Sequence, residues 1–319
     1  MISTIFTSLG ISSLKLFSES LLSLYPVIVK KVKLPLTYQM WVRLAIYSII
    51  SIFFANFSAL LNYFLKPITL LLALVNAVHI FCSYVGFKIL DSGVSYSIFY
   101  TYPILILFFS GQKFTPLYLL PFIGTLILSL HKPIKKDAKK EDDKKKEKKN
   151  KRFESFKNES KKQTLEEAVA EEEEKKKTTK RWWGILAMIG SSLTEVAIYF
   201  IVKRINDKNS WNILLLAYFL PAIAMSFYLN KNIWKKQYVK HLGIAALANG
   251  LIGTIGYFLR FFTIPRLPAN IYSVLSYFGV IMAYVYGLIF NKERITAWRS
   301  IGSGLIILSG IFLYLTNKK

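Results

Sequence analysis

Residues 68–89, ITLLLALVNAVHIFCSYVGFKI, form an apolar segment that is interrupted only by single polar residues. A helix of this length crosses the roughly 30 Å hydrocarbon core of a bilayer, because one crossing needs about 20 apolar residues. Segmentation of the chain on charge and turn signals gives ten such predicted spans: 5–29, 38–62, 68–89, 94–111, 116–131, 182–203, 211–229, 241–263, 270–290 and 299–316. The sequence therefore predicts an all-α membrane protein of about ten transmembrane helices.

Charged side chains are concentrated in one part of the chain. The sequence is 53% hydrophobic, and residues 132–181 hold 20 of its 42 Lys and Arg and 13 of its 18 Asp and Glu. The other 269 residues therefore keep 22 basic and 5 acidic side chains. Globular proteins carry about 25% charged residues, mostly on their surface. We therefore expect an integral multi-pass membrane protein that is surrounded by a lipid bilayer.

The net charge of +24 and the single cysteine exclude several other classes of protein. Membrane proteins gather Lys and Arg in their cytoplasmic loops, and no basic patch here is interleaved with aromatic residues, so we expect no nucleic-acid partner. Cys82 alone cannot form a disulfide within one chain or a cysteine-based metal site. The sequence has no HExxH motif, nucleophile elbow or paired carboxylates at a fixed spacing. We predict that the protein is not an enzyme and holds no metal or cofactor.

The charged segment at 132–181 divides the chain into two membrane halves, 1–131 and 182–319, of five predicted spans each. It contains only eight apolar residues in fifty, which is too few to form a core, and we expect a disordered Lys/Glu-rich linker. Its second part has the capping-box spacing of Thr164 and Glu167 and several Glu residues four positions before Lys, which favours a short helix. The linker is either a solvated charge run or a docking segment for a partner.

The two halves resemble each other in sequence. ALVNAVHIFCSY at 73–84 aligns without a gap to ALANGLIGTIGY at 246–257, which pairs Asn76 with Asn249 and Tyr84 with Tyr257. Further short matches follow in the same order along both halves. Because each half has an odd number of spans, the second enters the membrane the other way up. This predicts the inverted repeat of secondary transporters, which place their substrate site near the bilayer midplane between the halves.

The last part of each half carries a further pattern. Residues 268–315 read PANIYSVLSYFGVIMAYVYGLIFNKERITAWRSIGSGLIILSGIFLYL, and residues 85–115 read VGFKILDSGVSYSIFYTYPILILFFSGQKFT, without the Glu of the second half's turn. The chain thus resembles the drug/metabolite transporter superfamily in its ten-helix EamA-like and nucleotide-sugar-transporter-like branch. The resemblance implies a transporter with cytosolic termini. The distribution of Lys and Arg instead favours a cytosolic linker.

Ionisable residues inside predicted spans are functional candidates, because each costs roughly 2.5–3.5 kcal/mol at the bilayer centre unless it is satisfied within the bundle. They are Lys15, Glu19, Arg43, His79, Lys88, Glu195 and Arg260. Lys15 and Glu19 are spaced to neutralise each other or to serve in gating or coupling. Glu195 has no such neighbour in its span, so it is either a proton-coupling group or part of an inter-helix salt bridge.

Arg260 shares one predicted helix face with Asn249, Gly253 and Gly256, which lie four, three and four residues apart. This face is either a packing seam with Arg260 reaching to the membrane surface, or a cavity wall on which Asn249 and Tyr257 bind substrate and Arg260 attracts an anion. Lys88 either adds a second positive charge or is a solvated lysine at a helix end.

His79 is expected to be a hydrogen-bonded core residue. Arg43 resembles a basic residue common in the family, which either anchors the helix at the lipid headgroups or contacts substrate. Most aromatic residues belong to interfacial belts, and Tyr84, Tyr100, Tyr257 and Tyr277 are the expected exceptions because they fall away from the span ends. A small-residue face at Gly302–Gly304 indicates close helix packing and a contact for a homo-oligomer.

Together these patterns predict a secondary transporter, an exporter or exchanger of a small polar and anionic metabolite, that works by alternating access. The predicted substrate-binding residues are Asn76, Tyr84, Lys88, Asn249, Tyr257, Arg260 and Tyr277, and the predicted coupling or gating residues are Glu19 and Glu195. The alternative is a membrane scaffold without transport that recruits partners through its charged linker.

Overall fold

The computed structural model describes residues 2–64, 66–111, 116–130, 159–229 and 235–316, and every regular element in these ranges is a helix. The first half contains α1 (Ile2–Leu22), α2 (Tyr25–Lys31), α3 (Leu36–Phe54), α4 (Phe57–Leu61), α5 (Pro67–Ile89), α6 (Ser92–Phe99), α7 (Tyr102–Phe109), η1 (Pro116–Leu119) and α8 (Leu120–Leu130). The second half contains α10 (Glu159–Ile205), α11 (Ser210–Ser226), α12 (Lys236–Ala248), η4 (Asn249–Gly253), α13 (Thr254–Thr263), α14 (Ala269–Ser276), α15 (Phe278–Asn291) and α16 (Ala297–Thr316). The predicted all-α fold is confirmed.

Six helical segments within the described ranges are long and apolar enough to cross a membrane. They are Leu36–Phe54, Pro67–Ile89, Ser92–Phe109, Thr178–Ile205, Gln237–Thr263 and Ala269–Asn291. Helix α11, at 17 residues, is a shorter apolar helix. The predicted span 5–29 is divided between α1 and α2, and the predicted span 116–131 is divided between η1 and the 11-residue α8.

The break within the fourth predicted span coincides with a proline. Pro103, which we expected inside the fourth span, stands instead at the start of α7, and the chain leaves the helix at Tyr100 and Thr101 just before it. Proline favours the first turn of a helix, because its missing N–H needs no partner there and its ring prevents the preceding helix from continuing. The fourth predicted span is therefore two short helices, α6 and α7, rather than one.

The second part of the predicted linker is helical in the structure and not disordered. Its first part, 132–158, lies outside the described residues. From Glu159 the chain forms one 47-residue helix, α10, which continues through the sixth predicted span to Ile205. The predicted short helix at Thr164 is therefore not separate. Neither Gly nor Pro occurs between Glu159 and Arg181, and the sequence there favours an uninterrupted helix.

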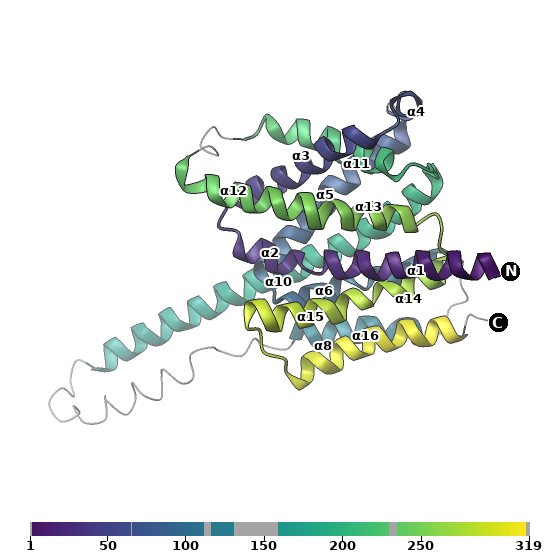
Figure 1. Ribbon diagram of the computed structural model, residues 1–319. Coiled ribbons are helices and arrows are strands. Elements are labelled where there is room, and N and C mark those ends of the chain that lie inside the picture. The colour runs from purple at the N-terminus through teal and green to yellow at the C-terminus, as the bar shows by residue number, and fades with distance from the viewer. Residues whose placement is uncertain (1, 65, 112–115, 131–158, 230–234, 317–319) are drawn as a thin grey trace.

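The helices form a bundle whose two ends differ (Figure 1). The start of α1 and the end of α16 lie at one end, and the N-terminal turns of α10 project beyond the other. We call the latter the α10 end. The two halves of the chain contact each other throughout the bundle: α1 packs against α13, α14 and α15, and α10 packs against α5, α6 and α7. The core therefore consists largely of contacts between the two halves.

Helices α8 and α16 also pack closely against each other. A Cβ atom at Gly124 would lie 2.9 Å from the Ile306 side chain and in collision range of the Gly302 backbone. A Cβ atom at Gly302 would lie 2.8 Å from Leu128, whereas one at Gly304 would meet nothing within 4 Å. The close packing predicted for Gly302 is thus present, and it lies within the chain.

Candidate functional site

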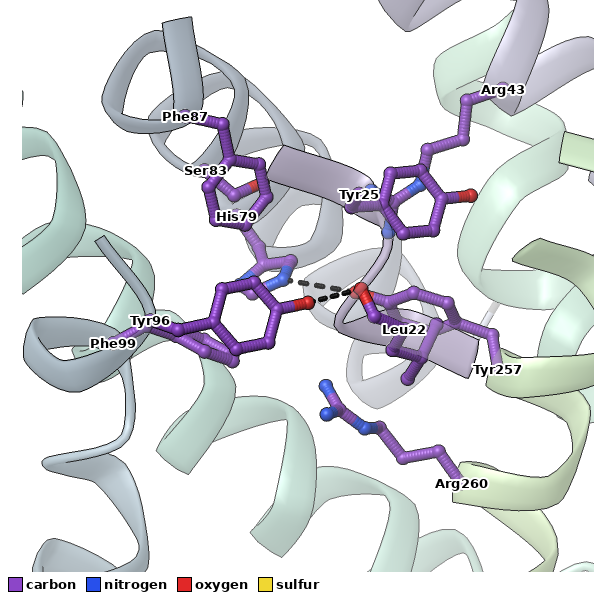
Figure 2. Close-up of a pocket in the computed structure, with 10 residues that line it drawn as sticks. All are labelled: Leu22, Tyr25, Arg43, His79, Ser83, Phe87, Tyr96, Phe99, Tyr257 and Arg260. Carbon is purple, nitrogen blue, oxygen red and sulfur yellow. Dashed lines mark hydrogen bonds between the residues drawn. The ribbon is translucent and has the colours of Figure 1, made fainter. Parts of the chain in front are cut away.

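A small pocket lies inside the bundle between the two halves (Figure 2). Its volume is about 10 Å³, which is roughly the space that one water molecule needs. The lining residues come from both halves: Leu22, Tyr25, Arg43, His79, Ser83, Phe87, Tyr96, Phe99, Tyr257 and Arg260. Two of them are arginines, and Figure 2 shows that their side chains approach the pocket from different helices, α3 and α13.

Arg260 is the centre of an ion-pair network. Its Nη1 donates to Glu195 Oε1 at 2.9 Å, and its Nη2 donates to Glu19 Oε2 at 3.0 Å and Oε1 at 3.2 Å. Lys15 Nζ and the Tyr100 hydroxyl also donate to the Glu19 carboxylate. Arg260 is 1% exposed, which rules out a side chain that reaches to the membrane surface. It lines the pocket as predicted, but its charge is already matched by two carboxylates.

Glu19 and Glu195 come from different halves and meet at the same guanidinium. Glu195, which we considered either a proton-coupling group or a salt-bridge partner, forms the salt bridge. Its second oxygen, Oε2, is buried without a hydrogen-bond partner and lies 3.5 Å from His79 Nε2. The Lys15–Glu19 pair predicted from the spacing is present, and Arg260 adds a second cation to it.

His79 is buried and hydrogen-bonded on both sides of its ring. Nδ1 lies 3.2 Å from the carbonyl oxygen of Ser191, which can only accept, so Nδ1 carries the proton of this contact. Nε2 lies 3.3 Å from the Tyr257 hydroxyl, which can then donate to it. A neutral imidazole satisfies both contacts. This is the core histidine expected from the sequence, and it also lines the pocket.

Arg43 has a different environment from Arg260. It is 1% exposed, which disfavours the headgroup anchor, one of the two roles considered for it, and leaves the substrate contact. Five tyrosine rings surround its guanidinium at centroid distances of 4.5 to 5.9 Å: Tyr25, Tyr47, Tyr84, Tyr218 and Tyr257. We call these five residues the tyrosine cage. Nη2 donates to the Tyr218 hydroxyl at 3.3 Å, and Nε is buried without a partner. Among the described residues, no carboxylate forms an ion pair with Arg43.

Tyrosine hydroxyls of the cage are connected to the eighth predicted span. The Tyr25 hydroxyl contacts that of Tyr47 and donates to Asn249 Oδ1 at 2.7 Å. Asn249 begins η4, a single π-helical turn between α12 and α13. Such turns occur often at functional sites because they shift the side chains that follow. Gly253 lies at the end of η4. A Cβ atom at this position would collide with these two hydroxyls, so the contact requires glycine.

The other predicted binding residues are only partly brought together. Tyr84 and Tyr257 belong to the cage. Asn76 is buried, and its Nδ2 donates to the Ala217 carbonyl at 3.0 Å. Tyr277 is buried at the junction of α14 and α15 but does not line the pocket. Lys88 is exposed, one residue before the end of α5, and does not contribute charge to the pocket.

Sequence reasoning missed three residues of the cage, Tyr25, Tyr47 and Tyr218, because it assigned most aromatic residues to interfacial belts. Tyr47 and Tyr218 lie near the middle of the predicted spans 38–62 and 211–229. Tyr84 and Tyr257 were selected because they fall away from the span ends. The same criterion could have selected Tyr47 and Tyr218. Tyr25 lies near the end of its predicted span and gave no such signal.

A second polar cluster closes the α10 end of the bundle. The Glu293 carboxylate, in the turn after α15, accepts from Lys30 Nζ at 2.8 Å and from the backbone N–H and the hydroxyl of Ser92 at 2.8 Å each. Burial would raise the pKa of Glu293, but the Lys30 charge and the Ser92 donors hold it below its ordinary value. Asp91 and Arg299 form another ion pair nearby in sequence. We call the Lys30–Ser92–Glu293 contacts the latch, because they join the two halves.

Comparison with known proteins agrees with this architecture. Residues 182–316 match the EamA-like transporter family. No curated protein shows detectable similarity to the chain. One solved structure, described as the crystal structure of a protein, aligns over 96% of this chain and 99% of its own, with a TM-score of 0.56 and 12% identity. At that identity the likeness establishes a shared fold alone.

The family match lies on the second half and includes the turn with Glu293 that carried the resemblance in the sequence. Its members are membrane transporters, which agrees with the expectation that the protein is not an enzyme. The resemblance is confirmed over the second half, where residues 182–316 match the EamA-like transporter family, and the protein is an integral multi-pass membrane protein.

Proposed function

We propose that the protein is a secondary transporter that moves a small anionic metabolite by alternating access between two inverted five-helix halves. The observation that carries this proposal is the charge around the pocket. Among the described residues, the polar interior contains three buried cations, Lys15, Arg43 and Arg260, and two buried carboxylates, Glu19 and Glu195. With His79 neutral, this set carries one excess positive charge.

An uncompensated charge at this depth is costly. Leaving one partner of a buried ion pair unmatched costs about 3–5 kcal/mol in soluble proteins, and a single cation at the bilayer centre costs roughly 2.5–3.5 kcal/mol or more. A bound anion would remove this cost while it occupies the pocket. The charge therefore favours an anionic substrate over a cationic or neutral one.

The inverted repeat is supported by how the helices contact one another. Helix α1 of the first half packs on α13 of the second half, and α10 of the second half packs on α5 of the first half. A pseudo-two-fold axis between the halves requires such a reciprocal pair of contacts. Helix α6 packs on α15 and helix α7 packs on α14, so the fourth and ninth spans of the proposed arrangement run antiparallel. We accordingly propose 1–131 and 182–319 as the two repeats.

Both of these spans are broken at corresponding places. The first leaves the helix at Tyr100 and Thr101, and the second at Tyr277, which aligns with Thr101 when the recurring Tyr-Ser pairs at 96–97 and 272–273 are superimposed. Interrupted helices in corresponding positions of two halves are the strongest sequence pointer to a transporter's binding site. The Tyr100 hydroxyl lies on the Arg260 network, which places one of the breaks beside the pocket residues.

Transport requires the halves to separate. A pocket of about 10 Å³ is too small for a metabolite, so this conformation is occluded. Opening toward the α10 end breaks the latch around Glu293. Glu19 and Glu195 are the proposed coupling residues, since a change in their protonation or pairing releases Arg260 and with it the contact between α1, α10 and α13.

The test is flux through the full-length protein in proteoliposomes. Labelled inorganic phosphate, a sugar phosphate and a set of carboxylates are compared with amines and neutral sugars of similar size. We expect saturable uptake of anions, accelerated by unlabelled anion on the opposite side. Flux restricted to amines or neutral sugars would contradict the anionic assignment, and no flux of any compound would favour the scaffold alternative.

A deletion of residues 135–178 is the matched control. All residues of the pocket and the latch lie outside this segment, so a transporter keeps most of its flux when the segment is removed. A scaffold that works through the charged linker loses its function instead.

A further inference from the structure

We propose that Arg43, and not Arg260, is the anion-binding residue of the pocket, and that the ligand presents a single carboxylate or phosphate group with one negative charge to it. This inference rests on the proposed function and deepens it. Sequence reasoning placed the anion at Arg260 and Lys88, and the contacts of the described residues favour a different location.

Both terminal nitrogens of Arg260 are engaged by carboxylates, although its Nε, like that of Arg43, is buried without a hydrogen-bond partner. Its Nη1 and Nη2 donate to two carboxylates at 2.9 to 3.2 Å, and both carboxylates are at most 1% exposed. An anion that approached Arg260 would displace Glu19 or Glu195 and leave that carboxylate buried and unpaired. Together with Lys15, these residues form a neutral group of two cations and two anions.

Arg43 is fully charged and lacks an anionic partner among the described residues. The tyrosine cage offers the faces of five aromatic rings, which attract a cation but carry no net charge. The nearest rings, those of Tyr257 and Tyr25, lie 4.5 and 4.8 Å from the guanidinium carbon. The cage therefore stabilises the cation without neutralising it, which leaves the charge available to a ligand.

The hydrogen bonds of Arg43 leave one of its donors free. Nη2 donates to the Tyr218 hydroxyl at 3.3 Å, and the Tyr84 hydroxyl also forms a side-chain hydrogen bond with the guanidinium, but Nε is buried without a partner although the residue lines the pocket. The guanidinium is a planar fork of donors that matches the two oxygens of a carboxylate or phosphate. A compact anion at this edge would satisfy the Nε–H group that the protein leaves without an acceptor.

The pocket also limits the charge of the ligand. One positive charge is in excess, so one negative charge restores neutrality inside the bundle. A group with two charges at the same place would leave a net negative charge beside Glu195, whose Oε2 already lacks a donor. We therefore expect acetate and the monoanion of inorganic phosphate to bind, and succinate to bind no more tightly than acetate.

The experiment measures the thermal unfolding midpoint of the full-length protein in detergent as acetate, inorganic phosphate, succinate, chloride or methylammonium is titrated. The variants are Arg43→Gln, Arg43→Lys and the control Arg266→Gln. Arg266 is an arginine outside the pocket, whose guanidinium donates to the carbonyls of Phe262 and Lys208. Wild-type protein and the control should show the same saturable rise of the midpoint with acetate and phosphate.

Arg43→Gln should weaken the apparent affinity for both anions at least tenfold, and Arg43→Lys should lie in between because it keeps the charge and loses the planar fork. Without added anion, Arg43→Gln should unfold at the same temperature as wild-type protein or higher, since the change removes an unmatched buried charge. A structural role for Arg43 predicts a lower midpoint, and that result overturns the proposal.

Two further outcomes also overturn it: anion stabilisation that persists unchanged in Arg43→Gln, and stabilisation by chloride or methylammonium alone. The flux assay separates this inference from the proposed function. Anion flux that survives Arg43→Gln leaves the transporter in place and removes only the Arg43 site. Flux of cations alone removes both.

Discussion

Arg43 and Arg260 are both 1% exposed, both line the same pocket and both lie against the Tyr257 ring, yet only one of them has carboxylate partners among the described residues. Arg260 pairs with two carboxylates, one from α1 and one from α10. Arg43 is surrounded by neutral tyrosine rings. Burial of a charge therefore does not define its role. The first arginine connects the two halves of the bundle, and the second keeps a charge that no side chain in the described residues neutralises.

This difference predicts opposite effects of removing the two charges. A matched charge leaves its partners unpaired when it is lost, whereas an unmatched charge leaves nothing behind. The more fully a buried charge is matched, the more stability its removal should cost.

Arg260→Met should have the largest effect. It leaves Glu19 and Glu195 buried with only Lys15 to balance them, so we expect a loss of about 3–5 kcal/mol in the free energy of unfolding. Denaturant unfolding in detergent measures it, with Arg43→Met as the comparison. If Arg43→Met destabilised the protein as much as Arg260→Met, the two arginines would have the same structural role and the contrast drawn here would be wrong.

The two carboxylates around Arg260 should also differ from each other. Glu19 accepts from Lys15, Tyr100 and Arg260, whereas Glu195 accepts one hydrogen bond from Arg260 and leaves Oε2 without a partner. We expect Glu19→Gln to cost about 2–3 kcal/mol and Glu195→Gln about 1 kcal/mol, because hydrogen bonds to charged groups contribute roughly 1.5–3 kcal/mol each and act here as one network. Denaturant unfolding of both isosteric variants under the same conditions measures the two losses of stability. A larger loss for Glu195→Gln than for Glu19→Gln would contradict the network.

The latch provides a charged contact outside the membrane-spanning segments. Glu293→Gln should cost about 1–2 kcal/mol of stability at neutral pH by weakening the contacts with Lys30 and Ser92. The pKa of Glu293 is held below its ordinary value of 4.5, so its contribution is present above that value and is lost as the pH falls through the folded-state pKa.

The difference in unfolding free energy between wild-type protein and Glu293→Gln should therefore be constant from neutral pH down to about 5 and shrink at lower pH. Asp91→Asn is the control. Its carboxylate pairs with Arg299 at the same end but is 39% exposed, and exposed ion pairs contribute about 0–1 kcal/mol. A difference for Glu293→Gln that grows on acidification would mean that burial, and not Lys30, dominates the carboxylate.

Tyr218→Phe should have the smallest effect, about 0.5–1 kcal/mol, because it removes one long hydrogen bond from Arg43 and keeps the aromatic ring of the cage. The same change in an Arg43→Gln background should have less effect, and a double-mutant cycle measures the coupling. Independent, additive effects would show that the hydroxyl does not act on Arg43.

Several features of the bundle could be predicted from the sequence. Long apolar segments with few charges predict membrane helices, and the short list of ionisable residues within them contained Arg43, Glu19, Glu195 and Arg260, which are all buried. This works because lipid offers no partner to a charge, so an ionisable residue in such a segment faces the bundle interior. Lys88 was the exception. It lies at the end of its helix, where a lysine side chain reaches solvent.

Local pairing was also predictable. Lys15 and Glu19 lie four residues apart, and a helix places such residues on one face, so their contact follows from the helix alone. Pro103 lies inside the predicted span 94–111, and a proline in such a position either kinks a helix or ends it. Whether a proline bends a helix or starts a new one depends on what satisfies the freed backbone groups, which involves neighbouring helices.

The sequence by itself determined that the chain is helical, lies in a membrane and holds a few charges inside, because composition and periodicity report how much polar surface must be hidden. Only the tertiary structure decided which charge meets which. Arg260 pairs with carboxylates 65 and 241 residues away, and Arg43 has no such partner. Long-range pairing depends on how the two halves dock, and no local pattern contains that information. The distinction between a matched and an unmatched arginine, on which the proposed anion site rests, therefore appears only in the folded bundle.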